Sequence, residues 1–282
     1  MLKNQKMDWP FLFILPSLLG FLLFYICPFL TSLRYVFVDK PVNGNFVGMQ
    51  NFIDLFQSKS YLNGLKNTLI FMGISIPVNI VLSLRISLMI HKMTGQKELF
   101  TLLFLIPLVI PSGSMLYFWK MLFDYNGYVN NLLFRIGIDK VNWLGTSLAR
   151  YVMIGVFVWK SLGYNIVLFL SGLSSIPKEY YAAAKVDGAS EIQEFFKITL
   201  VHLLPTLIVI VILSIIDSFK IFKEIYLIAG NYPHDSIYTL QHFMNNMFHS
   251  LNYQKLTTAT CVLVLAITMS TQILFKLEKK VR

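Results

Sequence analysis

The stretch TLVHLLPTLIVIVILSII, residues 199–216, decides the fold of this chain. It contains no Asp, Glu, Lys or Arg, and as a helix it is long enough to cross most of the roughly 30 Å hydrocarbon core of a lipid bilayer. Its apolar residues follow one another without the every-second-residue alternation of a membrane β-strand. Because lipid cannot hydrogen-bond a bare backbone, the stretch is predicted to be a transmembrane helix.

Five more blocks of this kind divide the rest of the sequence. They are residues 11–33, 67–90, 99–119, 151–176 and 256–275. The chain has 282 residues, of which 56% are hydrophobic and only 13% charged, and its mean hydropathy is +0.63. These values exclude an ordinary soluble domain. The sequence therefore predicts an all-α polytopic membrane protein of six transmembrane helices, organised as one domain over residues 1–282.

Several of these blocks contain prolines, each of which removes a backbone donor and favours a kink. In a bundle the freed carbonyls can be satisfied by neighbouring helices or by water in a cavity. The prolines therefore favour a packed, functional bundle of transmembrane helices over helices that merely anchor the chain in the membrane. They are Pro16, Pro28, Pro77, Pro107, Pro111 and Pro205.

The formal net charge of +10 does not indicate a nucleic-acid partner, because the Lys and Arg residues are spread thinly between apolar blocks. Their density near the span ends instead predicts orientation. The N-terminus, the second loop and the C-terminal tail share one side, which places both termini in the cytoplasm. The predicted external loops are residues 34–66, 120–150 and roughly 217–255, whose composition suits short interfacial helices. The basic residues used are Lys3, Lys6, Lys92, Lys97, Lys276, Lys279, Lys280 and Arg282.

The loop between the fourth and fifth spans has a distinctive series of helix signals. Pro177 suits the start of a helix, and Ala182, Ala183 and Ala184 are good helix formers. Gly188 can take the left-handed conformation that ends a helix. Directly after it, Ser190-Glu191-Ile192-Gln193 is typical of a capping box that opens a second helix. The three alanines leave one side of the first helix smooth, which suits a docking element.

The segment IPKEYYAAAKVDGAS at 176–190, with ITLV at 198–201, resembles a known family. That family comprises the permease subunits of binding-protein-dependent ABC importers, in the carbohydrate-uptake branch of maltose or multiple-sugar type. Members carry Glu-Ala-Ala and a later Gly, preceded by Ile-Pro and followed by Ile-Thr-Leu-Pro. This sequence departs from the pattern with Ala182 at the glutamate and Val201 at the proline. Matches continue in family order at 46–52, 67–68, 104–107, 119–123, Gly127 with Asn130, 143–144 and 163–165.

The resemblance implies a type I ABC importer permease (MetI-like) fold in a bacterial inner membrane, with an ATPase-docking loop at about 177–200. It implies a second homologous permease, two ATPase subunits that bind ATP and Mg, and an extracytoplasmic solute-binding protein, while this chain binds no cofactor. The implied cargo is a sugar or oligosaccharide. The alternatives are polyamine or glycerol phosphate cargo, or an ion-driven secondary transporter. The implied docking residues are Tyr181, Ala182, Ala183, Ala184, Lys185, Asp187 and Gly188.

Polar side chains within or beside the spans are the candidates for a translocation path. An ionised group at the bilayer centre costs about 2.5 to 3.5 kcal/mol, so Lys160 either faces a path or pairs with a carboxylate or a backbone carbonyl. Asp217 and Lys220 can equally form a local ion pair, and Asn79 and Asn165 can hydrogen-bond between helices. No nucleophile, nucleotide-binding or metal-ligand pattern is recognised, so no catalytic residue and no metal site are predicted.

Overall fold

The computed structural model describes residues 9–281, and within that range the regular secondary structure is helical, with one isolated β-bridge between Val38 and Phe46. Five helical stretches are long and apolar enough to cross a membrane. Three of them are single helices, namely α4 (Lys59–Lys92), α8 (Ala149–Ser174) and α13 (Tyr253–Val281). The other two are α1 (Trp9–Phe21) with α2 (Cys27–Tyr35), and α10 (Glu191–Glu194) with α11 (Leu200–Ala229), each pair joined by a π-helical turn.

The third predicted span is broken in the structure. It consists of α5 (Lys97–Val109) followed by α6 (Ser112–Phe123), and the chain bends by 94° at the break. Ile110 and Pro111 both have extended backbones there. For Ile110 the cause is Pro111, because a proline disfavours helical conformation in the residue before it. The six predicted spans are therefore present when this bent pair counts as one, but the expectation of one continuous helix over 99–119 is wrong.

The fifth span is longer than predicted. The expected external loop from residue 217 is wrong at its start, because α11 continues without interruption to Ala229. Gly230, with φ of +76°, then ends the helix. Three of the four charges in this stretch are accommodated inside the helix by ion pairs, of Lys220 with Asp217 and of Glu224 with Lys160. The fourth, Lys223, is exposed. The short helices expected in external segments are α3 (Gln50–Gln57), α7 (Tyr128–Arg135) and α12 (Leu240–His249).

The chain forms two compact units, and the single domain expected from the sequence stays a prediction. The first unit comprises residues up to 59 together with 246–266. In it, the Asn51 side chain donates to the carbonyls of Val36 and Val38, which fixes the turn after α2 to α3. The residues Lys3, Lys6 and Arg282, used to predict orientation, lie outside the described part of the chain.

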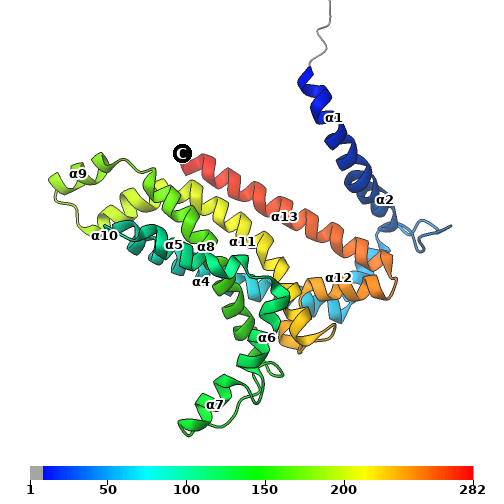
Figure 1. Ribbon diagram of the computed structural model, residues 1–282. Helices are drawn as coiled ribbons and strands as arrows, with labels where there is room; N and C mark the ends of the chain where they lie inside the picture. The colour runs from blue at the N-terminus through cyan, green and yellow to red at the C-terminus, as the bar shows by residue number, and fades with distance from the viewer. Residues whose placement is uncertain (1–8, 282) are drawn as a thin grey trace, which may run out of the picture. The chain divides into compact units, whose positions relative to one another are not determined.

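The second unit comprises residues 60–245 and 267–282, and it holds most of the buried core. Two hydrophobic clusters join α4, α8 and α11, one around Phe157 and Ile225 and the other around Phe169 and Leu203. Figure 1 shows α9 (Lys178–Val186) at the end of this unit where α8 finishes and α11 begins. The core thus places two regions of interest: a helical loop at one end of α8 and α11, and a cavity between their middles.

Candidate functional site

The helical loop after α8 begins with α9 and stops at Gly188. Three backbone hydrogen bonds close its C-terminus, including Ala189 N–H to the Ala184 carbonyl at 2.9 Å and Gly188 N–H to the Lys185 carbonyl at 3.1 Å. This pair of bonds is a Schellman motif, which requires a left-handed residue after the helix. Gly188 supplies it with φ of +76°. The predicted glycine stop is therefore confirmed in detail.

The second helix of the loop, α10, begins with the predicted capping box. The Gln193 N–H donates to the Ser190 hydroxyl at 3.4 Å, and the Ser190 N–H donates to the Gln193 side chain at 2.9 Å. A π-helical turn, Phe195–Thr199, leads from α10 into α11. The Tyr181 hydroxyl lies 2.9 Å from the Thr199 hydroxyl, so one hydrogen bond ties α9 to the start of the fifth span.

The unit formed by α9, Gly188 and α10, named the docking unit here, presents an apolar surface. Ala182 and Ala183 are exposed, and so are Val186 at 88% and Ile192 at 71%. Phe196, in the π-helical turn that follows, is 59% exposed. Several large apolar side chains exposed on one short segment suit an interaction surface. Of the remaining predicted docking residues, Lys185, Asp187 and Gly188 are exposed, while Tyr181 and Ala184 are half-buried.

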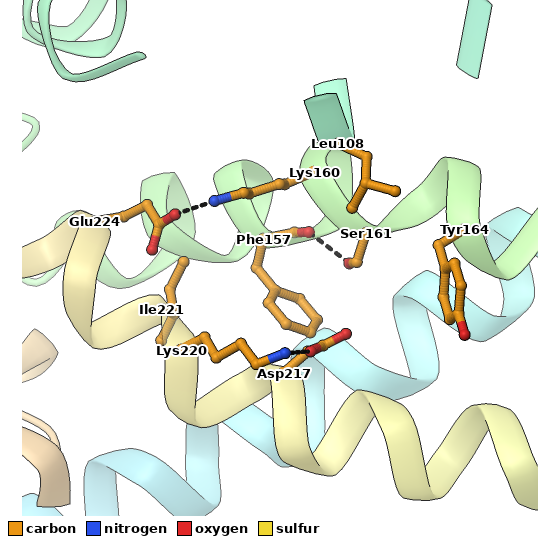
Figure 2. A pocket seen from close by; sticks show the side chains of 9 residues that line it. All are labelled: Leu108, Phe157, Lys160, Ser161, Tyr164, Asp217, Lys220, Ile221 and Glu224. Atoms are coloured by element: carbon orange, nitrogen blue, oxygen red, sulfur yellow. Dashed lines mark hydrogen bonds and ion pairs between the residues drawn. The ribbon is translucent and has the colours of Figure 1, made fainter. Parts of the chain in front are cut away.

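The second region is a cavity of about 150 Å³ between α5, α8 and α11, named the central cavity. The structure brings together three of the predicted path residues on its wall: Lys160, Asp217 and Lys220. Figure 2 shows the Lys160–Glu224 pair at one end of this row of side chains and Tyr164 at the other. Its full lining is Leu108, Phe157, Lys160, Ser161, Tyr164, Asp217, Lys220, Ile221 and Glu224.

Both ammonium groups of the central cavity have carboxylate partners. Lys160 of α8 forms an ion pair with Glu224 of α11. Lys220 pairs with Asp217 at 2.6 Å within α11. Lys160 thus pairs with a carboxylate, one of the two expectations for it, while it also lines the cavity. The charges of the cavity wall therefore cancel.

The other two predicted path residues, Asn79 and Asn165, do not line the central cavity. Both are buried, at 0% and 2% exposure. The Asn79 amide donates to the Ser161 hydroxyl at 2.6 Å, which is an interhelical hydrogen bond between α4 and α8. Their alternative role, hydrogen bonding between helices, is the one that this geometry supports for Asn79.

Comparison with known proteins shows that the docking unit and the central cavity lie within a segment matched by one protein family. Residues 44–282 match the model of the family described as binding-protein-dependent transport system inner membrane component. The chain belongs to this family of permeases. The family resemblance drawn from residues 176–190 is thereby confirmed, and so is the all-α permease fold.

Individual relatives of the permease cover almost its whole length. The trehalose/maltose transport system permease protein MalF of Thermococcus litoralis is 31% identical, over 95% of this chain and 94% of that protein. The sn-glycerol-3-phosphate transport system permease protein UgpA of Yersinia pestis is 28% identical, over 97% of this chain and 95% of the relative. Among solved structures, a bacterial ABC transporter involved in the import of alginate has the same fold, with a TM-score of 0.84 at 23% identity, covering 98% of this chain and 96% of that one.

Sequence reasoning missed two important polar residues of the permease: Glu224, which lines the central cavity, and Ser112, which binds Glu224. Glu224 is 6% exposed, and its carboxylate binds both Lys160 and the Ser112 hydroxyl. The sequence could have indicated Glu224, because a lysine within a span predicts a carboxylate partner and the neighbouring spans contain few carboxylates. Ser112 carried no signal, since its position depends on the break in the third span. Within residues 9–281 no three His, Cys, Asp or Glu side chains gather as a metal site.

Proposed function

We propose that this permease is the transmembrane subunit of an ATP-driven importer of a neutral sugar or oligosaccharide, forming half of the translocation path. One observation carries the proposal: the docking unit is an exposed, largely apolar element at the end of α8 and α11. Such a unit suits a cleft in a cytoplasmic ATPase. In this proposal, two ATPase subunits bind ATP and Mg²⁺, a second homologous permease completes the path, and an external solute-binding protein delivers the cargo.

Contact with the ATPase would depend on shape more than on one charge. Ala182 occupies the position of the family's glutamate, and together with Ala183 it leaves a low, exposed surface. Val186 and Ile192 are highly exposed apolar side chains of the same unit. Burial of such side chains contributes about 25 cal/mol per Å², so a smooth surface with two apolar projections can dock without a salt bridge.

The proposed orientation places the docking unit and both termini in the cytoplasm. It is supported by the ion pair between Lys92 and Glu191, with 3.5 Å between Nζ and Oε2. This contact brings the basic loop after α4 to the same end of the unit as α10. Basic residues concentrate in cytoplasmic loops, so the loop and the docking unit favour the same side.

The choice of a neutral cargo follows from the paired charges of the central cavity. An anion such as glycerol phosphate is bound by cationic groups that are free to contact it. Here Lys160 and Lys220 each contact a carboxylate already. Hydroxyl groups, which both donate and accept hydrogen bonds, suit such a wall better. The trehalose/maltose relative also supports this choice.

The test is ATP hydrolysis by the assembled complex in lipid nanodiscs, with the solute-binding protein that co-purifies with it. Stimulation by that protein loaded with maltose, trehalose or a related oligosaccharide, and not by the unloaded protein, is the expected result. Stimulation only by sn-glycerol 3-phosphate or a polyamine would overturn the cargo. Uptake by this chain alone in vesicles, driven by an ion gradient without an ATPase, would overturn the whole proposal.

A further inference from the structure

The central cavity adjoins a second cavity of about 460 Å³, named the outer cavity. The outer cavity is lined by Ser112, Phe222, Lys223 and Gln241 among others. Three side chains, Lys160, Lys220 and Glu224, line both cavities. A side chain that contributes to the walls of two adjacent cavities lies between them. These three therefore form the partition that separates the two spaces.

Within this partition, Lys160 and Glu224 hold three helices together. The ion pair joins α8 to α11. The Ser112 hydroxyl donates to the Glu224 carboxylate at 2.9 Å and accepts from the Lys160 ammonium at 2.9 Å. Ser112 is the first residue of α6, directly after the break in the third span. The contact between Lys220 and Asp217, by contrast, stays within α11.

We propose that Lys160, Glu224 and Ser112 form a polar gate that closes the passage between the outer and central cavities, with Glu224 as its central residue. The inference rests on the proposed function, because it takes both cavities as parts of one transport path. Glu224 is the buried member, at 6% exposure, and both other groups bind its Oε1 atom. Removing its carboxylate therefore breaks both of these contacts at once, and only the hydrogen bond from Lys160 to Ser112 remains.

The chemistry of the gate explains how a polyhydroxylated cargo could take the place of Ser112 and so release α6 from α8 and α11. The Ser112 hydroxyl serves simultaneously as donor to the carboxylate and acceptor from the ammonium. A sugar hydroxyl can make the same two hydrogen bonds, so it can replace Ser112 without leaving either charge unpaired. A phosphate can only accept from Lys160, and it would repel Glu224. The gate therefore passes neutral hydroxyl-rich molecules in preference to anions.

The gate predicts how fast a reagent from outside reaches the central cavity. Ser161 lines the central cavity but not the outer one. The experiment places Ser161→Cys in a background in which Cys27 and Cys261, the two free cysteines, are replaced by serine. The assembled complex in sealed vesicles is then treated from outside with a membrane-impermeant, charged thiol reagent, without cargo or ATP. The measured quantity is the rate of modification at position 161.

With the gate intact, modification is expected to be slow. Glu224→Gln should raise the rate by about tenfold, because a lost hydrogen bond to a charged group changes an equilibrium by at least about that factor. Lys160→Gln removes the same ion pair from the other side and should raise the rate likewise. The exchange of charges, Lys160→Glu with Glu224→Lys, should restore slow modification. A merely structural role for Glu224 would not give this recovery.

The matched control is Lys92→Gln. It also removes an ion pair between two helices, that of Lys92 with Glu191, but this pair lies at the docking unit and not at the gate. It should leave the rate at position 161 unchanged. Equal rates in all variants, or a rise with Lys92→Gln as large as that with Glu224→Gln, would overturn the gate. Because these rates need no cargo and no ATP hydrolysis, they are separable from failure of the proposed function, which appears as absent ATPase stimulation in the unmodified complex.

Discussion

A Cβ atom added at Gly163 would overlap the backbone carbonyl of Phe104, so α8 approaches α5 this closely only because residue 163 has no side chain. Small residues at such contacts let membrane helices approach each other closely, where dispersion forces and interhelical bonds replace the hydrophobic effect. The contact positions α5 against the helix that carries Lys160. It therefore fixes one wall of the central cavity.

The first prediction concerns this contact. Gly163→Ala should destabilise the permease by about 1 to 3 kcal/mol, because neither backbone can yield without moving a helix. Thermal unfolding of the complex in detergent measures the effect. Gly155→Ala is the matched control in the same helix, since nothing lies within 4 Å of an added Cβ there, and better helix propensity should stabilise by up to about 1 kcal/mol. Equal melting temperatures for the two variants would contradict this packing.

The second prediction concerns the left-handed turn of the docking unit. Gly188→Ala should cost about 1 to 2 kcal/mol of local stability, because an L-residue with a Cβ disfavours this conformation. An added Cβ meets no atom within 4 Å, so the cost comes from the backbone alone. Cargo-stimulated ATP hydrolysis should fall several-fold while the amount of permease in the membrane, measured by immunoblot, stays constant. Gly188→Asn is the control and should lose much less, because Asn tolerates left-handed backbone.

The third prediction concerns the hydrogen bond between the docking unit and the fifth span. Tyr181→Phe removes the hydroxyl that lies 2.9 Å from Thr199, which should cost about 1 kcal/mol. Amide hydrogen exchange in α9 should become roughly fivefold faster as this segment opens more often. Tyr180→Phe removes a hydroxyl from the neighbouring exposed residue, while the ring contact with His202 at 5.1 Å can persist. Equal acceleration by both variants would refute a specific role for Tyr181.

The fourth prediction concerns pH and His242, a buried residue of α12. Burial lowers the pKa of His242 to about 4 from its ordinary value of 6.5. The unfolded chain therefore binds more protons than the folded one between these two pH values, and stability falls as the pH drops from about 6.5 to about 4. The full loss is roughly 3 kcal/mol.

The measurement is thermal unfolding of the complex as a function of pH, compared with that of His242→Gln. At neutral pH, the Thr239 N–H donates to His242 Nδ1 at 3.2 Å, and this acceptor is lost on protonation. The variant cannot gain a charge at this position, so its curve should be flatter between pH 6.5 and pH 4. Parallel curves for the two proteins would show that another group dominates the acid sensitivity.

The docking unit was predictable from sequence because its signals are local. A glycine stop and a capping box act within a few residues, and Gly188 and Ser190 with Gln193 form them as expected. The apolar blocks were equally clear, since a bilayer imposes a length on each span. The sequence therefore predicted the helix ends and the membrane spans, because these depend on neighbouring residues or on the thickness of the membrane.

The interior required tertiary information. Pro107 lies inside α5 without ending it, whereas the chain breaks at Pro111, four residues later. Both prolines lack the same donor, so the difference depends on which freed backbone groups find partners in the folded bundle. In the same way, a lysine within a span predicted a carboxylate partner for Lys160, but only the packing of α8 on α11 identifies that partner as Glu224. The path residues proposed from the sequence remain predictions for the same reason.

The bend in the third span also bears on whether lipid, water or protein covers this side of the permease. Hydrocarbon chains cannot supply partners for backbone groups freed at a break in a span. At this bend the Pro111 carbonyl accepts from the N–H groups of Ser114 and Met115. At this bend, Pro111 is exposed and Val109 is 79% exposed on the chain alone. We expect water or another polypeptide, not acyl chains alone, to cover this exposed break in the span. A spin label at Val109 should relax with water-soluble reagents, or become immobile on assembly, and should stay shielded from oxygen dissolved in the acyl chains.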